Sequence, residues 1–210
     1  YSHLYIFDRM YKGGITGGLC FGHNPCQSIP NTHKVRKAWD KLDWLAIGDV
    51  FHNETTDNWH RPGVDPKKIK TEVFLLPSAY RAEKEGTISN SGRWMMWHYK
   101  AVEPRGQSRD MGSIFVELMN RVKGLYSKNG GAFPEPIIHA DYPEKFEAEE
   151  VTRRVNGYFT RDTVVNGKEY KKGQLVPGFA NLMDDGSTSS LCWVYCGCFS
   201  EKEGNLSKRR

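Results

Sequence analysis

Residues 18–49, GLCFGHNPCQSIPNTHKVRKAWDKLDWLAIGD, carry the clearest pattern of strand and helix in the sequence. The apolar run at 18–21 predicts a short buried strand, and a loop rich in turn-forming residues follows it. Asn31 is a good helix N-cap, and apolar side chains recur after it with helical spacing. A second apolar run, 44–48, ends in Asp49. This order of strand, loop, helix and strand predicts two parallel strands whose carboxyl ends face one crevice.

The same alternation continues up to about residue 128. Residues 73–76 predict a third strand that stops at Pro77, and residues 109–126 carry apolar side chains at i, i+3, i+4 and i+7 spacing, typical of an amphipathic helix. We therefore predict an α/β domain over residues 1–128, built as an open, mostly parallel sheet with helices on both faces.

The remaining sequence, 129–210, begins with a cluster of turn formers and is polar and glycine-punctuated. It predicts an irregular extension, packed on the first domain or on the rest of a longer protein. Two segments in it have a clearer pattern. Residues 144–155 indicate an acidic helix, and residues 191–196 read as a buried strand.

Composition excludes several classes of protein. The net charge is only +5, and 38% of the 210 residues are hydrophobic, with no apolar run of the roughly eighteen residues that a membrane span needs. Basic clusters at 67–70 and 208–210 lack any nucleic-acid module signature, so they indicate solvated faces rather than a nucleic-acid partner. The amino terminus has no signal pattern, and we expect that it is not the natural start.

The cysteines do not predict a metal site or a disulfide framework. Their number is odd, and their placement is uneven. The spacing of Cys192, Cys196 and Cys198 matches neither zinc nor common iron–sulfur patterns. In a buried strand at 191–196 these thiols would act as small hydrophobic groups.

The loop Gly22-x-Asn24-Pro25 is the first candidate for ligand binding. Glycine allows close approach of the backbone, and the asparagine amide offers donors and an acceptor that suit a base, a ribose or a phosphate. Asp49 would accept two hydrogen bonds from a ribose diol or a guanine edge. Both features also fit a plain turn and a helix cap or loop ion pair. The loop lacks the G-x-G-x-x-G fingerprint, which disfavours an ordinary nicotinamide or flavin site.

Several ordered segments together carry a family resemblance. They are Gly22-x-Asn24-Pro25, Lys34-Val35-Arg36, Leu42-Asp43-Trp44, Gly48-Asp49-Val50-Phe51 with Glu54-Thr55, and the stretches 71–77, 82–87, 90–97 and 104–110. In this pattern the chain resembles the third domain of the molybdopterin oxidoreductases. Residues 5–13, 156–158, 179–186 and 188–193 are most similar to the large, catalytic (alpha) subunit of selenocysteine-containing formate dehydrogenases, of which the chain looks like an internal piece.

The resemblance implies a cofactor and a set of contacts. The cofactor is molybdenum or tungsten held by two molybdopterin guanine dinucleotides, and domains of this kind bind the guanosine and diphosphate end of one of them. Carried over residue by residue, the implied cofactor contacts are Gly22, Asn24, Gly48, Asp49, Lys84 and Asp110. No catalytic residue or metal ligand is implied. The selenocysteine or cysteine metal ligand and the 4Fe-4S cysteines have no counterpart in these residues, so we expect this chain alone to be inactive.

The resemblance also implies a context. The whole subunit would oxidise formate to carbon dioxide and pass electrons to iron–sulfur clusters in anaerobic respiration. Its partners would be the remainder of the large subunit, an iron–sulfur small subunit and a membrane or cytochrome subunit, and its location would be the periplasm. Two alternatives stay open: a fragment of a periplasmic nitrate reductase-type molybdoenzyme, and a non-redox nucleotide-binding module.

Overall fold

The computed structural model describes residues 2–141 and 143–208. The chain forms two compact units. Unit 1 contains the chain up to Tyr80 together with Pro104–Met111, and unit 2 contains Arg81–Glu103 together with the chain from Gly112 onward. The predicted division into residues 1–128 and 129–210 stays a prediction.

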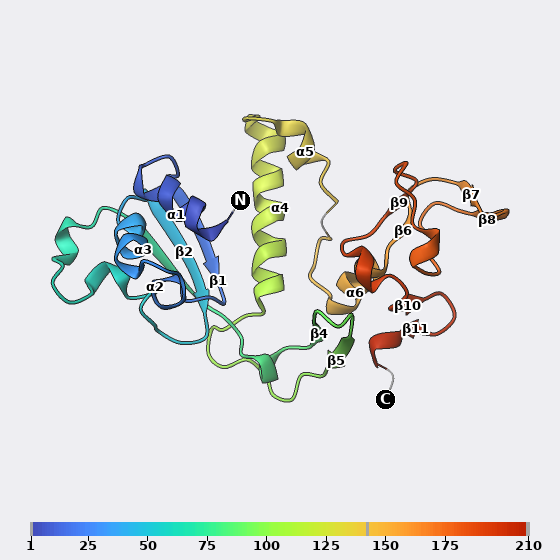
Figure 1. Ribbon diagram of the computed structural model, residues 1–210, viewed down its shortest axis with the longest axis horizontal. Coiled ribbons are helices and arrows are strands. Elements are labelled where there is room, and N and C mark those ends of the chain that lie inside the picture. Colours follow the sequence, from blue (N-terminus) through green and yellow to red (C-terminus); the bar gives the residue numbers. More distant parts are fainter. Residues whose placement is uncertain (1, 142, 209–210) are drawn as a thin grey trace. The chain divides into compact units, whose positions relative to one another are not determined.

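Unit 1 is built on a parallel sheet of three strands, β1 (Gly17–Phe21), β2 (Trp44–Asp49) and β3 (Glu72–Pro77), in the order β1-β2-β3 (Figure 1). Phe21 pairs with Gly48, and Asp49 pairs with Pro77, so the carboxyl ends of the three strands lie at one edge. The predicted α/β class and the parallel pairing of the first two strands are confirmed.

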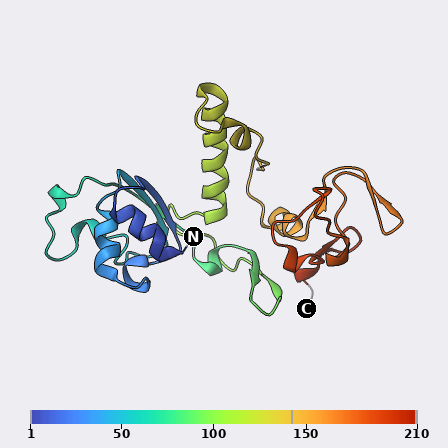
Figure 2. The same ribbon diagram turned by 45° about the horizontal axis from the view of Figure 1, so that its top comes forward.

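Three helices pack on this sheet: α1 (His3–Tyr11), α2 (Pro25–Ser28) and α3 (Thr32–Trp39). Asn31 caps α3 as expected, because its side chain accepts a hydrogen bond from the Lys34 N–H at 3.3 Å. The helices and the inward-facing strand residues share one core, and Figure 2 shows α1–α3 on the same side of the sheet. That core contains Phe7, Met10, Cys20, Cys26, Ile29, Val35, Ala38, Trp39, Leu42, Leu45 and Ile47.

The other face of the sheet carries Leu19, Trp44 and Phe74, which are all exposed. These side chains alternate along the strands with the buried ones, as the pleat of a sheet requires. Helices α1–α3 therefore cover one face of the sheet, and the prediction of helices on both faces stays a prediction for the second.

The segment between β2 and β3 contains two short 3-10 helices, η1 (Asn58–His60) and η2 (Pro66–Lys68). Arg61 fastens it to the end of α3 with a forked ion pair to Asp40, at 2.6 and 2.9 Å. Both side chains are mostly buried. The geometry is that of a bidentate arginine–carboxylate pair, which holds the segment over the core.

Unit 2 begins with the 3-10 helix η3 (Arg81–Glu83) and the antiparallel hairpin of β4 (Gly86–Ser89) and β5 (Met95–His98). Its helices are α4 (Met111–Asn129), α5 (Pro134–Ile138) and α6 (Ala148–Asn156). The predicted helices at 109–126 and 144–155 correspond to α4 and α6. No helix among the described residues is both long and apolar enough to pass through a membrane.

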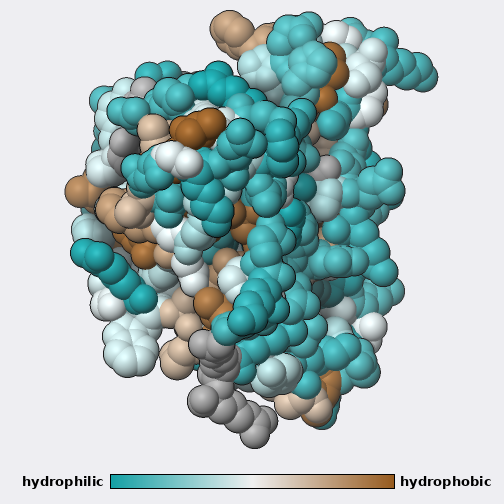
Figure 3. All heavy atoms as spheres, turned by 90° about the vertical axis from the view of Figure 1, so that its right-hand side faces the viewer, coloured by the Kyte–Doolittle hydropathy of each residue, from teal (hydrophilic) through white to brown (hydrophobic). Residues whose placement is uncertain are grey.

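The last third of the chain has little regular structure. Its strands are β6 (Tyr158–Phe159), β7 (Thr163–Val165), β8 (Lys168–Tyr170), β9 (Thr188–Ser189), β10 (Phe199–Ser200) and β11 (Gly204–Asn205), and its 3-10 helices are η4 (Phe179–Asn181), η5 (Trp193–Tyr195) and η6 (Leu206–Lys208). Its core contains Phe159, Val165, Tyr170 and Val176. Hydrophilic side chains dominate the face shown in Figure 3, and hydrophobic ones form only small, separate groups.

One predicted strand was wrong. Residues 191–196 form the turn of η5 instead of a strand, and Leu191 and Trp193 are exposed. A run of apolar residues does not by itself form a strand, because the backbone N–H and C=O groups of a strand need hydrogen-bond partners on a neighbouring strand. Here the backbone makes a local hydrogen bond instead: the Tyr195 N–H donates to the Cys192 carbonyl at 3.0 Å.

Candidate nucleotide-binding site

The carboxyl ends of β1 and β2 meet at Gly22 and Gly48. The Gly22 N–H donates to the Gly48 carbonyl at 2.9 Å, which extends the strand pairing by one residue. Gly22 has a φ of 61°, in the left-handed region that favours glycine. A Cβ on Gly48 would lie 2.2 Å from the Phe21 ring, so a larger residue does not fit there. The two predicted glycines therefore shape the edge where the chain leaves the sheet.

Asn24 joins the loop after β1 to the loop after β2. Its Nδ2 donates to Glu54 Oε2 at 2.6 Å, and its Oδ1 accepts from Thr55 Oγ1 at 2.8 Å. Thr55 is buried, and its Oγ1 also accepts from the Cys26 N–H at 3.1 Å. Both ends of the Asn24 amide are thus occupied by protein groups. In this structure Asn24 holds the loop after β1 against the loop after β2.

Asp49 is oriented by the turn that follows it. Its Oδ1 accepts from the Val50 N–H at 2.7 Å, and its Oδ2 accepts from Asn53 Nδ2 at 2.8 Å. Asn53 Oδ1 in turn accepts from the N–H groups of Thr55 and Thr56, at 2.9 and 3.2 Å. The carboxylate is therefore fixed in direction, and each of its oxygens keeps a lone pair for a further donor.

A hollow of about 210 Å³ opens beside Asp49 at this edge. It is lined by Ile47, Asp49, Val50, Phe51, His52, Thr56, Leu75, Leu76 and Pro77. Mostly apolar walls with one carboxylate suit a flat heterocycle whose N–H groups need an acceptor. A guanine edge or a ribose diol can supply such donors, so these residues fit one end of a guanine dinucleotide.

Asp110 and Lys84 have different places in the structure. Arg109 forms a parallel bridge with Ser78, just past the end of β3, and the Ala79 N–H donates to the Arg109 carbonyl at 2.8 Å. Asp110 follows Arg109 and so belongs to the same edge of unit 1 as Asp49. Lys84 belongs to unit 2, directly after η3. Its convergence with the other residues stays a prediction.

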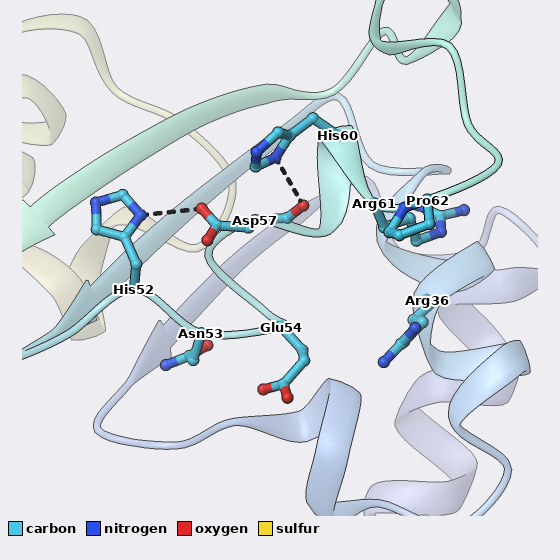
Figure 4. A pocket seen from close by; sticks show the side chains of 8 residues that line it. All are labelled: Arg36, His52, Asn53, Glu54, Asp57, His60, Arg61 and Pro62. Carbon is cyan, nitrogen blue, oxygen red and sulfur yellow. Dashed lines mark hydrogen bonds and ion pairs between the residues drawn. The ribbon is translucent and has the colours of Figure 1, made fainter.

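A second, larger hollow of about 480 Å³ lies on the other side of the turn (Figure 4). Its lining residues are Arg36, His52, Asn53, Glu54, Asp57, His60, Arg61 and Pro62. His52 lines both hollows, and its Nδ1 lies 2.9 Å from Asp57 Oδ1. In the sequence, Arg36 and Glu54 belong to segments that carry the family resemblance, and neither residue is predicted to line a pocket. Nothing in their spacing indicated that α3 and the loop after β2 enclose a common space.

Protonation states follow from these contacts. The hydrogen bond from Asn24 holds the pKa of Glu54 below its ordinary value, and the charge of Arg36 adds to the effect. Burial raises the pKa of the Cys20 thiol to about 11 and also raises that of Cys26. Thiols of this kind stay protonated and are poor nucleophiles. Among residues 2–141 and 143–208, no group of His, Cys, Asp and Glu side chains could hold a metal ion.

Comparison with known proteins identifies the relatives of the chain. No family model matches it. The alpha subunit of formate dehydrogenase 2 (cytochrome c-553) from Nitratidesulfovibrio vulgaris is 59% identical over 210 residues, which is 100% of this chain and 21% of that protein. The chain is a relative of the formate dehydrogenase alpha subunits. The subunit from Megalodesulfovibrio gigas is 44% identical over 216 residues, again with 100% of this chain and 21% of that protein.

A nitrate reductase is less similar to the chain. A nitrate reductase from Symbiobacterium thermophilum is 33% identical over 122 residues, which is 58% of this chain and 14% of that protein. The formate dehydrogenase subunits match the whole chain, whereas the nitrate reductase does not. The chain spans about a fifth of the length of the formate dehydrogenase relatives that it matches.

Proposed function

We propose that this chain is part of the catalytic alpha subunit of a formate dehydrogenase. The whole subunit would oxidise formate to carbon dioxide and pass the electrons to iron–sulfur clusters. The observation that carries the proposal is the identity of 59% and 44% to two formate dehydrogenase alpha subunits over all of this chain. We expect the chain by itself to be inactive, because the metal ligand has no counterpart in these residues.

The role that we propose for this segment is to bind the guanosine and diphosphate end of one pterin dinucleotide. Asp49 would accept hydrogen bonds from the guanosine within the hollow between β2 and β3. Asp110 would accept from a ribose hydroxyl at the same edge, and Lys84 would neutralise charge on the diphosphate. Asn24 and Asn53 support this role through the hydrogen bonds that fix the two loops. When bound, the molybdenum or tungsten centre supplies the redox chemistry.

The remaining parts of the proposal concern the whole enzyme. The selenocysteine and the 4Fe-4S cluster would lie outside these residues, in the remainder of the large subunit. An iron–sulfur small subunit and a membrane or cytochrome subunit would be partners. The relative from N. vulgaris carries cytochrome c-553 in its name, which supports a cytochrome as electron acceptor. The proposed location is the periplasm.

Activity of the full-length subunit tests the proposed reaction. The purified protein should reduce an artificial electron acceptor when formate is added, and it should not oxidise a reduced dye when nitrate is added. Reduction of nitrate without oxidation of formate would instead support the nitrate reductase alternative, to which the partial match of 33% identity points.

A further inference from the structure

The larger hollow contains Arg36, whose guanidinium makes no ion pair with another described residue. Arg36 extends from α3 into the hollow, opposite the loop that carries Glu54 (Figure 4). Its Nε is buried and makes no hydrogen bond, and within the described part of the chain no carboxylate forms an ion pair with its guanidinium. A buried polar group without a partner is costly. Arg36 as a whole is only half-buried, and it lines the open hollow, from which an acceptor can approach its guanidinium.

The other charged groups of the hollow already have partners. Arg61 is bound in the fork with Asp40, and His52 contacts Asp57. Glu54 accepts the hydrogen bond from Asn24, and the charge of Arg36 lowers the pKa of Glu54, but no ion pair joins the two side chains in the described part of the chain. Arg36 can therefore form an ion pair with an additional carboxylate, and no ion pair among the described residues that line the hollow has to break.

The surface next to the hollow is basic. The chain leaves the hollow at Pro62 and continues through an exposed segment that carries Lys67, Lys68 and Lys70. Only Asp65 opposes them in sequence, and its side chain is used to cap η2 by accepting from the Lys67 N–H at 3.1 Å. A segment with more than one acidic side chain would meet complementary charge both inside and beside the hollow.

We propose that the hollow around Arg36 receives an acidic side chain from a polypeptide segment of the full-length subunit outside these 210 residues. The inference rests on the proposed function, in which this chain is part of a subunit about five times longer. An open hollow of about 480 Å³ has room for a side chain and its neighbouring backbone. The carboxylate would form charge-assisted hydrogen bonds with Arg36, and its segment would lie along the lysines.

Cross-linking of the intact subunit tests the proposal. Arg36→Lys places a primary amine in the hollow, and a carbodiimide joins an amine to a carboxylate only when the two are in contact. The expected product is an amide between residue 36 and an aspartate or glutamate outside residues 1–210, identified by mass spectrometry of tryptic peptides. Lys37, exposed at the next position of α3, gives the background. Cross-linking only to Glu54 or to another carboxylate within these residues, or none at position 36, would overturn the proposal.

A second measurement needs no variant. Phenylglyoxal should modify the exposed Arg9 of α1 in the native wild-type subunit and spare Arg36. If Arg36 reacts as readily as Arg9 and inorganic phosphate protects it, the hollow binds a small anion. The proposal that a polypeptide segment occupies the hollow is then wrong. Metal and guanine nucleotide content is measured in the same samples. Arg36 lies outside the proposed nucleotide site. If only this inference fails, the subunit still contains metal and guanine nucleotide. If the proposed function fails, the subunit contains neither.

Discussion

Asn24 and Glu54 are 30 positions apart in sequence, and the Nδ2 of one donates to the Oε2 of the other at 2.6 Å. The contact joins the loops that follow two neighbouring parallel strands, at the edge where such sheets bind ligands. Together with the hydrogen bond from Thr55 to Asn24, it gives the candidate site a fixed frame before any ligand is bound.

We predict that Asn24→Ala destabilises unit 1 by about 1–3 kcal/mol, because the buried Thr55 hydroxyl loses its acceptor. Urea denaturation followed by tryptophan fluorescence measures the loss. Glu54→Gln is the matched control, since it keeps an oxygen that the Asn24 amide can use, and it should cost less. An equal and small effect of both changes would show that the two loops do not depend on this contact.

Asp8 provides a prediction about pH. It joins α1 to α3 through Lys34 at 2.5 Å, and it also contacts Lys12 at 2.7 Å. The hydrogen bonds from Lys12 and Lys34 lower the pKa of Asp8 from 3.8 to about 2. A carboxyl group with a lowered pKa stabilises the fold above its unfolded pKa, and this stabilisation is lost as the pH falls through the folded value.

Asp8→Asn should therefore lower stability near neutral pH, and the difference from the wild type should shrink between about pH 4 and pH 2. Urea denaturation of both proteins across this range gives the difference at each pH. A difference that stays constant down to about pH 2 would mean that the ion pairs to Asp8 contribute nothing to folding.

Gly48→Ala should destabilise unit 1 by about 1–3 kcal/mol, because the added methyl group would overlap the Phe21 ring. The melting temperature reports the change. Gly124→Ala is a control of opposite sign: it lies within α4 with open space at its Cβ, and alanine should stabilise the helix by roughly 0.5–1 kcal/mol. A Gly48→Ala protein as stable as the wild type would show that the packing at this edge is looser than the structure indicates.

The sequence predicted unit 1 better than unit 2 for a physical reason. Strands β1, β2 and β3 are apolar runs with a helix or turn between them, and a parallel sheet leaves few other arrangements for such a pattern. In unit 2 the run 191–196 is also apolar, yet it forms η5, and no strand among the described residues pairs with it. The hairpin of β7 and β8 could have been predicted from Asn166-Gly167, a typical turn between short strands.

The site was predictable only in part. Asp49 could be placed at the end of a strand, because strand ends follow from local pattern. The contacts of Asn24 with Glu54 and Thr55 depend on how two loops fold over one another, which spacing does not determine. For the same reason, the hollow around Arg36 could not be predicted from the amino-acid sequence of α3.

Asp49 is proposed to bind the guanosine end of the cofactor, and the metal and guanine nucleotide content of the intact subunit shows whether it does. Asp49→Ala removes hydrogen bonds to a charged acceptor, which should cost about 1.5–3 kcal/mol, or roughly ten- to a hundredfold in cofactor retention. Asp43→Ala, at the exposed opposite end of β2, is the matched control and should retain a full load. A protein with Asp49→Ala that carries as much metal and guanine nucleotide as the control would show that Asp49 does not bind the cofactor.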